Sequence, residues 1–333
     1  MTQTNYTFLR RAVARHSAIP LYRIDRHQKR SGGWRNICIP HPALMRVQRW
    51  ISHWLLRRLN PHPRSFAYAP GCSVLDCARI HCGCQWLLKF DISSFFETIS
   101  EREVYHVFHE AGYSELVSFE LSRLCTRVLA GEARYKKTEW RAHGGGITQY
   151  TDERLGHLPQ GAPTSPMLSN LVFKKTDNII FDLCQSSGWF YSRYSDDISM
   201  SHSGRMPIKR ADAEKMIGRM HQTLQKAGYT PNLKKTSVSP PGSRKIVLGL
   251  LVDSKAPRLS RKFRSRLEQH LYFITKYGWH EHASKLRFQS ITGLYHHLKG
   301  LVSYACLIDP SWGDEMNASF LKLPPPNVIL LAT

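Results

Sequence analysis

The stretch Tyr191-Ser-Arg-Tyr-Ser-Asp-Asp-Ile-Ser-Met-Ser201 (YSRYSDDISMS) places two neighbouring carboxylates in a run that otherwise has the composition of β-strands. Aromatic and apolar residues stand on both sides, which predicts a β-hairpin with Ser195, Asp196 and Asp197 at its tip. A solvated turn explains such a pair when it stands alone, because aspartate favours turns. Two carboxylates joined by a third can instead bind divalent cations, which cancel their repulsion. The second interpretation requires a third carboxylate elsewhere in the chain.

The candidate for the third carboxylate is Asp91, which lies near the end of an apolar run at 85–92 (QWLLKFDI) that is typical of a buried strand. A carboxylate at such a place is costly unless a cation compensates it, although a simple strand-end or helix-capping role is the alternative. Asp91, Asp196 and Asp197 on two neighbouring strands would hold two Mg²⁺ ions about 4 Å apart. Such a site activates a hydroxyl for attack on a phosphate and stabilises the leaving pyrophosphate.

The composition of the chain points to a polyanionic partner. Among 333 residues, 47 Lys and Arg face 25 Asp and Glu, which gives a net charge of +22. Nucleic acid is the leading candidate for the partner of such a basic protein. An anionic membrane surface would attract the same charge, but no apolar run approaches the roughly 18 residues of a membrane span, and no signal peptide opens the sequence. We therefore expect a cytoplasmic location and no membrane partner.

Four of the eight cysteines crowd together beside His81, namely Cys72, Cys77, Cys82 and Cys84. Zinc could use such a cluster, but its spacing lacks the paired Cys-x-x-Cys of common zinc sites. Buried free thiols are the usual state of cysteine in a reducing cytoplasm. We interpret the cluster as packing.

The remaining patterns predict helices with a few short strands. Amphipathic or capped runs predict helices at 44–59, from the capping box Ser100-x-x-Glu103 to about 112, and at 211–227. Residues 7–30 are expected to be helical in parts, and the chain from 258 onward to be mostly helical. Strands are predicted at 34–39 and as a pair around 246–252, and a long loop or insertion at 131–157.

A third informative stretch is Leu158-Pro-Gln-Gly-Ala-Pro-Thr-Ser-Pro-Met-Leu-Ser-Asn170. Its prolines and glycine fix a turn, and the residues that follow open a helix, so a rigid backbone edge would lie where a base pair could rest. A purely structural turn is the alternative when this stretch is taken alone.

Taken in order, Phe90-Asp-x-x-x-Phe-Phe96, the stretch at 158–170 and Tyr194-x-Asp-Asp197 resemble the motifs of reverse transcriptases, and among them the bacterial retron-type enzymes. The resemblance covers about residues 34–310. It implies an α+β right-hand polymerase whose fingers and palm have an antiparallel sheet packed on helices, with a small helical thumb. The expected divisions are an N-terminal extension and fingers (1–85), a palm with the remaining fingers elements and the insertion (86–257), and a thumb with a C-terminal tail (258–333).

The resemblance also implies roles for single residues near the catalytic centre. Asp91, Asp196 and Asp197 would bind the two Mg²⁺ ions. Lys235, in Asn232-Leu-Lys-Lys-Thr236, would neutralise charge or donate a proton to pyrophosphate. The residues expected to contact the incoming nucleotide or the nascent pair are Arg35 on the triphosphate, Phe96 as a steric gate against a 2′-hydroxyl, Gln160 and Gly161 at the template, and Tyr194.

A second group of predicted residues would bind the duplex. The basic positions Arg258, Arg261, Lys262, Arg264 and Arg266 at the start of the thumb are expected to contact its phosphates. A solvated helix face is the alternative for each of them. Val247-Leu-Gly249 is similar to the primer-grip region of the family.

The function implied by the resemblance is RNA-directed DNA synthesis. The expected partners are a structured non-coding RNA that serves as template or primer, its cDNA product, dNTPs, and an effector or toxin protein within an anti-phage defence system. A non-retron defence-associated enzyme and a group II intron relative are the alternatives within the family. A catalytically idle RNA-binding scaffold and template-independent nucleotide addition are the alternatives in function.

Overall fold

The chain divides into two compact units. The computed structural model describes residues 4–15, 20–28, 32–128, 155–204, 207–324 and 326. The first unit comprises residues 1–77 and 86–238, and the second comprises 78–85 and 239–333. The boundaries predicted at 85 and 257 stay predictions, because a division into compact units does not assign fingers, palm or thumb. Most of the loop predicted at 131–157 lies outside the described residues.

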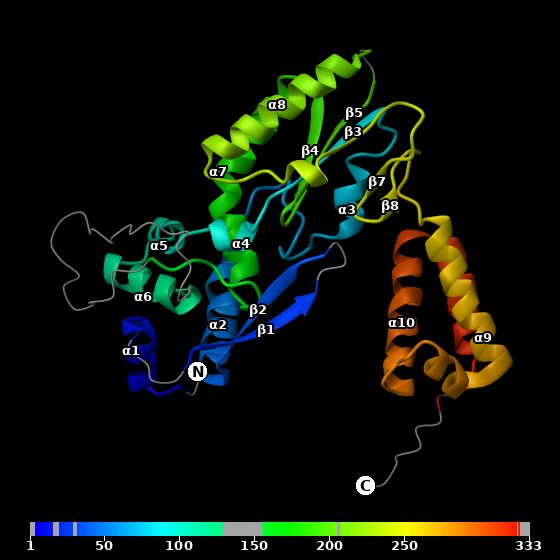
Figure 1. Cartoon of the computed structure of the whole chain (residues 1–333), viewed down its shortest axis with the longest axis horizontal. Helices are drawn as coiled ribbons and strands as arrows, with labels where there is room; N and C mark the ends of the chain where they lie inside the picture. The colour runs from blue at the N-terminus through cyan, green and yellow to red at the C-terminus, as the bar shows by residue number, and fades with distance from the viewer. Residues whose placement is uncertain are drawn as a thin grey trace, which may run out of the picture. The chain divides into compact units, whose positions relative to one another are not determined.

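The first unit is built on a four-stranded sheet with the strand order β4-β5-β3-β6. Its strands are β3 (Trp86–Asp91), β4 (Trp189–Tyr194), β5 (Asp197–His202) and β6 (Ser237–Ser239). The long helices α7 (Ser165–Gln185) and α8 (Arg210–Lys226) pack against this sheet (Figure 1). Apolar side chains of the central strands, such as Leu88 and Ile198, are fully buried in the core. The strand predicted at 85–92 and the hairpin predicted around 195–197 are both confirmed.

Shorter helices complete the first unit. They are α1 (Tyr6–Ala14), α2 (Pro42–Trp54), η1 (Leu56–Arg58), α3 (Val74–Arg79), α4 (Phe95–Thr98), α5 (Glu101–Glu110) and α6 (Glu115–Cys125). The predicted capping box is present, since Ser100 accepts from the backbone of Glu103 and the Glu103 side chain accepts from the backbone of Ser100. This reciprocal cap satisfies two backbone donors at the start of α5.

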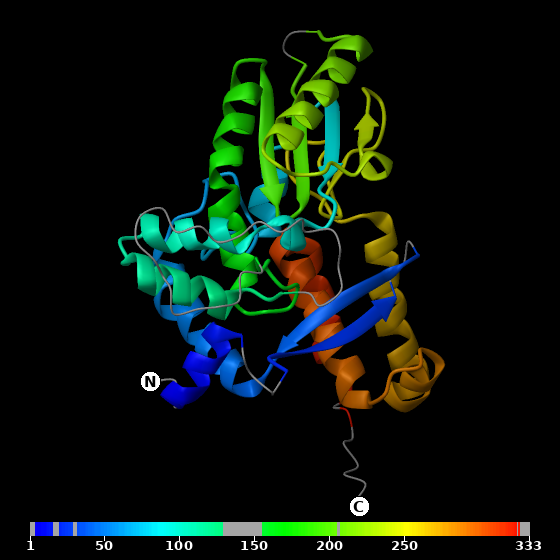
Figure 2. The same cartoon turned by 60° about the vertical axis from the view of Figure 1, so that its left-hand side comes forward.

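Two strands of the first unit form a separate hairpin. The strand β1 (Tyr22–Gln28) pairs antiparallel with β2 (Trp34–Pro40), and this ribbon is drawn in blue in Figure 2. The helix expected in parts of 7–30 occurs as α1, and the strand β1 was not predicted. The cause is that most of β1 is exposed and is held by backbone pairing, so its sequence carries no apolar alternation.

The second unit is mostly helical. It contains the small hairpin β7 (Ile246–Val247) and β8 (Leu250–Leu251), and the helices α9 (Arg261–Lys285), α10 (Ile291–Ile308) and α11 (Pro310–Leu321). The helices α9 and α10 lie side by side (Figure 1). The predicted strand pair and the helical C-terminal region are confirmed. No helix in the described ranges has both the length and the hydropathy that crossing a membrane requires.

The cysteine cluster predicted to be packing is divided between the two units. In the first unit Cys77 is buried, and its thiol donates to the Ser192 hydroxyl over 3.2 Å. In the second unit Cys84 is buried. Burial raises the pKa of both thiols to about 11. Both groups are therefore protonated at neutral pH, and neither is a reactive thiolate.

A pair of buried histidines makes the second unit sensitive to acid. His270 Nδ1 lies 2.9 Å from His282 Nε2, and burial together with the positive potential of His282 and His297 lowers the pKa of His270 to about 4. An unfolded histidine binds a proton near pH 6.5, so stability is present above that pH and is lost as pH falls from about 6.5 to about 4. The hydrogen-exchange protection factors of α9, which are corrected for the intrinsic exchange rate at each pH, should therefore fall between pH 7 and pH 5.

The control for this acid effect is a histidine on the same helix. His270→Gln removes the titrating group and should flatten the pH dependence of α9 protection. His280→Gln, at an exposed position, should leave that dependence as in the wild type. An unchanged pH dependence in His270→Gln would show that the buried histidine is not responsible.

Candidate functional site

The sheet register brings the three predicted carboxylates to one edge of the first unit. Asp91 is the last residue of β3 and lies directly opposite Asp197, the first residue of β5. Side chains at directly opposite positions project from the same face of a sheet. Asp196 precedes Asp197 in the turn, and its carbonyl accepts from the Ile92 amide over 3.3 Å. The structure thus brings Asp91, Asp196 and Asp197 together from two separate motifs.

The negative charge of Asp91 is balanced by a lysine of the same chain. Its carboxylate is almost fully buried, and Oδ1 accepts from Lys235 Nζ over 2.7 Å while Oδ2 accepts from Asn232 Nδ2 over 3.1 Å. Lys235 ends the short helix η2 (Leu233–Lys235). The hydrogen bond to Asp91 raises the pKa of Lys235, and the charges of all three aspartates act in the same direction. The predicted lysine is therefore held at the carboxylates.

The carboxylates repel one another in the absence of metal. Burial raises the pKa of Asp197, and the charges of Asp196 and Asp91 raise it further, against the opposing effect of Lys89 and Lys235. No cluster of three or more His, Cys, Asp or Glu side chains in the described ranges has the geometry of a preformed metal centre. The donor set still suits Mg²⁺, which prefers carboxylate oxygens, once the Asp91 side chain turns from Lys235.

The turn that carries Asp196 is held in an uncommon conformation. Tyr194 pairs with Asp197, so the hairpin turn consists of Ser195 and Asp196 alone. Ser195 has φ 59°, in the left-handed region that residues other than glycine rarely adopt. Its hydroxyl accepts from the Tyr68 hydroxyl over 3.2 Å, and its carbonyl accepts from Arg193 Nη1 over 3.0 Å. Two side chains from outside the turn therefore fix its shape.

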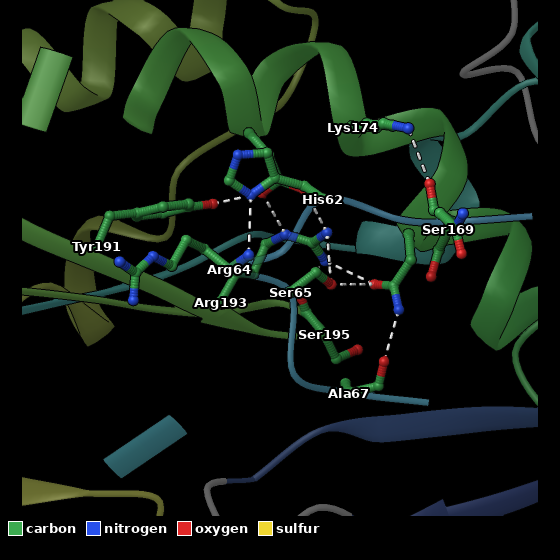
Figure 3. Close-up of polar contacts among 12 residues, drawn as sticks. His62, Arg64, Ser65, Ala67, Ser169, Lys174, Tyr191, Arg193 and Ser195 are labelled. Atoms are coloured by element: carbon green, nitrogen blue, oxygen red, sulfur yellow. Dashed lines mark hydrogen bonds and ion pairs between the residues drawn. The ribbon is translucent and has the colours of Figure 1, made fainter. Parts of the chain in front are cut away.

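Arg193 is the centre of a fully buried hydrogen-bond network below the turn. Figure 3 shows it next to Ser65, and its guanidinium also donates to the Ser195 carbonyl. Besides the Ser195 carbonyl, its guanidinium donates to both oxygens of Asp177, at 2.8 and 2.7 Å, to Asn170 Oδ1 at 2.9 Å and to Ser65 Oγ at 3.0 Å. All five N–H groups of the arginine are thus used. The network joins α7 and the segment around residue 65 to the hairpin.

Arg193 was not among the site residues predicted from the motifs. The available signal was a charged residue in a strand that otherwise reads as apolar, because a charge is almost never fully buried unless it is paired. Its partners Asp177 and Asn170 lie on α7, which the stretch at 158–170 opens. No feature of the local sequence identifies them as partners.

A sequence model of the family described as "Reverse transcriptase (RNA-dependent DNA polymerase)" matches residues 27–254. The chain belongs to this family. The matched segment includes both strands of the carboxylate edge and the Arg193 network. Members of the reverse transcriptase family depend on divalent metal ions.

Curated relatives confirm the resemblance to the retron type. The chain is 30% identical to the retron Ec86 reverse transcriptase of Escherichia coli, over 72% of this chain and 65% of the relative. It is 28% identical to the retron Mx162 reverse transcriptase of Myxococcus xanthus, over 89% of this chain and 59% of the relative. The chain therefore spans less than two thirds of the length of these relatives.

Solved structures with a similar trace include a telomerase from Candida albicans, with a TM-score of 0.45 and 12% identity over 93% of this chain and 56% of that one. A foamy viral protease-reverse transcriptase gives a TM-score of 0.42 and 17% identity over 87% of this chain and 36% of that one. The α+β fold predicted for the family is confirmed by the family match together with the helices and antiparallel sheets of the chain.

Gln160 and Gly161 contact the β1–β2 hairpin. The Gln160 carbonyl accepts from the Cys38 amide of β2 over 2.7 Å. Gly161 has φ 113°, and a Cβ at this position would lie 2.9 Å from Ile37 Cγ2 and 3.0 Å from the Cys38 carbonyl. The glycine is thus required for the close approach of the two segments. The predicted contact with the template stays a prediction.

We expect Gly161→Ala to lower the melting temperature by several degrees. The new methyl group meets the β2 backbone, and the positive φ adds strain, which together cost about 1–3 kcal/mol. Gly218→Ala is the matched control, because a Cβ on this helical glycine meets nothing within 4 Å. It should stabilise the chain by about 0.5–1 kcal/mol. Thermal unfolding of the two variants gives the comparison, and equal melting temperatures would contradict the argument.

The other predicted nucleotide contacts lie on three different elements, β4, α4 and β2. Tyr194 pairs with Asp197, and its ring centre lies 6.4 Å from that of Tyr68. Phe96 is half-buried in α4, and its ring centre lies 5.7 Å from that of Phe95. Arg35 is exposed on β2 and forms no ion pair within the described residues. The roles of all three stay predictions.

The five basic residues predicted to bind the duplex differ in whether an acidic side chain pairs with them. Arg258 donates to Asp253 over 2.9 Å, and Arg264 pairs with Asp309 and stacks on Trp312. The remaining three, Arg261, Lys262 and Arg266, are exposed at the start of α9. Of the five, only Arg261, Lys262 and Arg266 are free of acidic partners among the described residues. These three are therefore the stronger candidates for phosphate contacts.

Proposed function

We propose that the chain is an RNA-directed DNA polymerase of the retron type. The observation that carries this proposal is the pairing of Asp91 with Asp197 next to Asp196 in the turn. A structural scaffold gains nothing from three mutually repelling carboxylates, and the charges of Asp196 and Asp91 add to the effect of burial in raising the pKa of Asp197. The match of the chain to the reverse transcriptase family supports the same reaction.

The three aspartates would hold two Mg²⁺ ions, which supply activation of the attacking hydroxyl and stabilisation of the pyrophosphate. Lys235 donates to the buried Asp91 carboxylate and balances its charge before the metal binds. Its side chain is more than half exposed, so it can turn toward a triphosphate and neutralise its charge. Arg193 and Tyr68 hold the turn, so the positions of Asp196 and Asp197 are set before substrate arrives.

The proposed substrates are dNTPs and a structured non-coding RNA, and the product is cDNA. The net charge of +22 supports binding of a polyanion, and the exposed cations of α9 would contact its phosphates. Phe96 would exclude a 2′-hydroxyl, and Gln160 and Gly161 would support the nascent pair. All eight cysteines are free, which fits the cytoplasmic location we propose. Anti-phage defence and an effector or toxin partner are part of the same proposal.

The test is incorporation of labelled dNTPs on a defined RNA template with a DNA primer. We expect product whose sequence is complementary to the template, and no product in EDTA. Product of random sequence would indicate template-independent addition. Wild-type incorporation no greater than that of Asp196→Asn would favour an RNA-binding scaffold. Sequencing the nucleic acid that co-purifies with the chain would identify its RNA, and a defined RNA paired or joined with a short DNA is the expected result.

A further inference from the structure

The helix α8, which packs against β3 (Figure 1), carries a histidine that contacts two segments of the carboxylate edge. The ring of His221 lies edge-on to that of Phe90, with 5.7 Å between the ring centres, and Phe90 immediately precedes Asp91. His221 Nε2 also lies 3.2 Å from the hydroxyl of Thr236, which immediately follows η2. Burial lowers the pKa of His221, so its imidazole is neutral at pH 7 and carries one proton. The histidine thus joins α8 to β3 and to the segment that carries Lys235.

The direction of the hydrogen bond to Thr236 follows from the second partner of that hydroxyl. A hydroxyl has one proton, and Thr236 donates it to the Asn232 carbonyl over 3.2 Å. The hydroxyl therefore accepts from His221, whose proton lies on Nε2. The Asn232 carbonyl also accepts from the backbone amides of Lys235 and Thr236, each over 3.1 Å. These bonds close residues 232–236 into a turn, which we call the lysine turn, and His221 holds it from outside.

Asn232 attaches the lysine turn to Asp91 by two bonds of different kinds. Its backbone amide donates to the Asp91 carbonyl over 2.8 Å, whereas its side chain donates to the Asp91 carboxylate. When the carboxylate turns toward a metal ion, it loses its bond from Lys235. The backbone bond to Asp91 and the contact with His221 do not involve the carboxylate, so both remain. The lysine is then released while the turn that carries it stays in place.

We propose that His221 is a positioning residue, which acts through Thr236 to keep Lys235 within reach of the leaving pyrophosphate. The lysine side chain is more than half exposed and has a flexible four-carbon stem, so only its backbone can restrict where the ammonium goes. Charge is neutralised efficiently in a transition state only by a group that is already in place. The alternative is that His221 fills space beside Phe90 and contributes stability alone. This inference rests on the proposed function.

The first test measures how firmly the lysine turn is held in the chain alone. Hydrogen exchange of the segment 229–239 is followed by mass spectrometry in EDTA. His221→Phe keeps a ring against Phe90 but has no donor, whereas the side-chain amide of His221→Gln replaces the donor Nε2. Loss of this hydrogen bond should accelerate exchange of the segment about five- to tenfold in His221→Phe, and His221→Gln should stay within twofold of the wild type. Equal acceleration of 229–239 and of α7 would show a loss of stability alone and would overturn the proposal.

A matched pair of valine variants tests the link through the threonine. Thr236→Val removes the hydroxyl that joins His221 to the lysine turn, so exchange of 229–239 should accelerate as in His221→Phe. The double variant should exchange no faster than either single one, because both remove the same bond. Thr223→Val is the control, since the Thr223 hydroxyl donates to a carbonyl of its own helix, that of Arg219, over 2.9 Å. Equal exchange in the two valine variants would contradict the link.

The second test asks whether the link acts on the reaction through Lys235. His221→Phe should lower the rate of incorporation at saturating dNTP about fivefold and leave the KM for dNTP within twofold, and His221→Gln should restore most of the rate. In a Lys235→Met chain, His221→Phe should change the rate less than twofold, because no ammonium is left to position. An equal loss with and without the lysine would overturn the positioning role.

The failure of this proposal and that of the proposed function are distinguishable, because hydrogen exchange in EDTA needs neither metal nor catalysis. A wild type that incorporates no dNTP would remove the polymerase, while selective acceleration of 229–239 in His221→Phe would still support His221 as the residue that holds the lysine turn. A wild type that polymerises, with neither exchange nor rate changed in His221→Phe, would remove the role of His221 and leave the polymerase standing.

Discussion

Asp197→Asn is expected to lower dNTP incorporation by about a thousandfold and to leave the chain at least as stable as the wild type. A lost metal ligand costs several kcal/mol in the transition state, which is a factor of this size. Burial and the charges of Asp196 and Asp91 raise the pKa of Asp197, so its ionised form is less stable in the folded chain than in the unfolded one. In EDTA at pH 7 the amide removes this penalty, and the melting temperature should stay equal or rise.

The control for this prediction is Asp182→Asn, which makes the same chemical change at an exposed position of α7. Its incorporation rate should lie within twofold of the wild type. Primer extension and thermal unfolding on the same preparations give both quantities. A melting temperature of Asp197→Asn well below that of the wild type would show that the carboxylate stabilises the fold, against the direction of its pKa.

Arg193→Lys is expected to lower kcat by about tenfold to a hundredfold with little change in the KM for dNTP. Lysine keeps the positive charge beside Asp177, but its ammonium has three donors at one point and cannot replace five donors spread over a planar group. The bond to the Ser195 carbonyl and the bonds to Ser65 and Asn170 cannot all be kept. Because its turn is less well placed, this variant should also need a several-fold higher Mg²⁺ concentration for half-maximal activity.

A second buried arginine provides the matched control for loss of stability. Arg123 is 3% exposed, is paired with Glu101, and lies over the ring of Phe119 at 4.6 Å, as Arg193 lies over Phe173 at 4.6 Å. Arg123→Lys should destabilise the chain to a similar extent but leave kcat and the Mg²⁺ requirement near the wild type. Both variants are assayed well below the lower melting temperature. If Arg193→Lys matched Arg123→Lys in both kinetic quantities, the network would have a structural role alone.

The carboxylate edge could be predicted from the sequence because each part of it is local. The apolar run before Asp91 identifies a buried strand, and the aromatic residues around Asp196 and Asp197 identify a hairpin. The order of the motifs in the chain then implies the family, and the fold of that family places the two strands next to each other. The same resemblance predicted that Lys235 neutralises charge or donates a proton at the pyrophosphate, and the structure places its ammonium 2.7 Å from the Asp91 carboxylate.

Features that depend on distant partners could not be predicted. The strand β1 is polar and mostly exposed, and only its pairing with β2 makes it a strand. Arg193 reads locally as an exposed strand residue, because Ser65, Asn170 and Asp177 come from two other segments. Tyr68 likewise carries no local signal for its contact with Ser195.

The pairing of β3 with β5 also determines when the carboxylate edge can form. Asp91 and Asp197 lie in strands separated by the helices α4 to α7. Neither motif therefore has its partner until both segments have been synthesised and the sheet has closed. Contacts between such distant segments form late and slowly. A nascent chain that ends before β5 would therefore emerge from the ribosome with Asp91 facing solvent and no capacity to act on nucleotides.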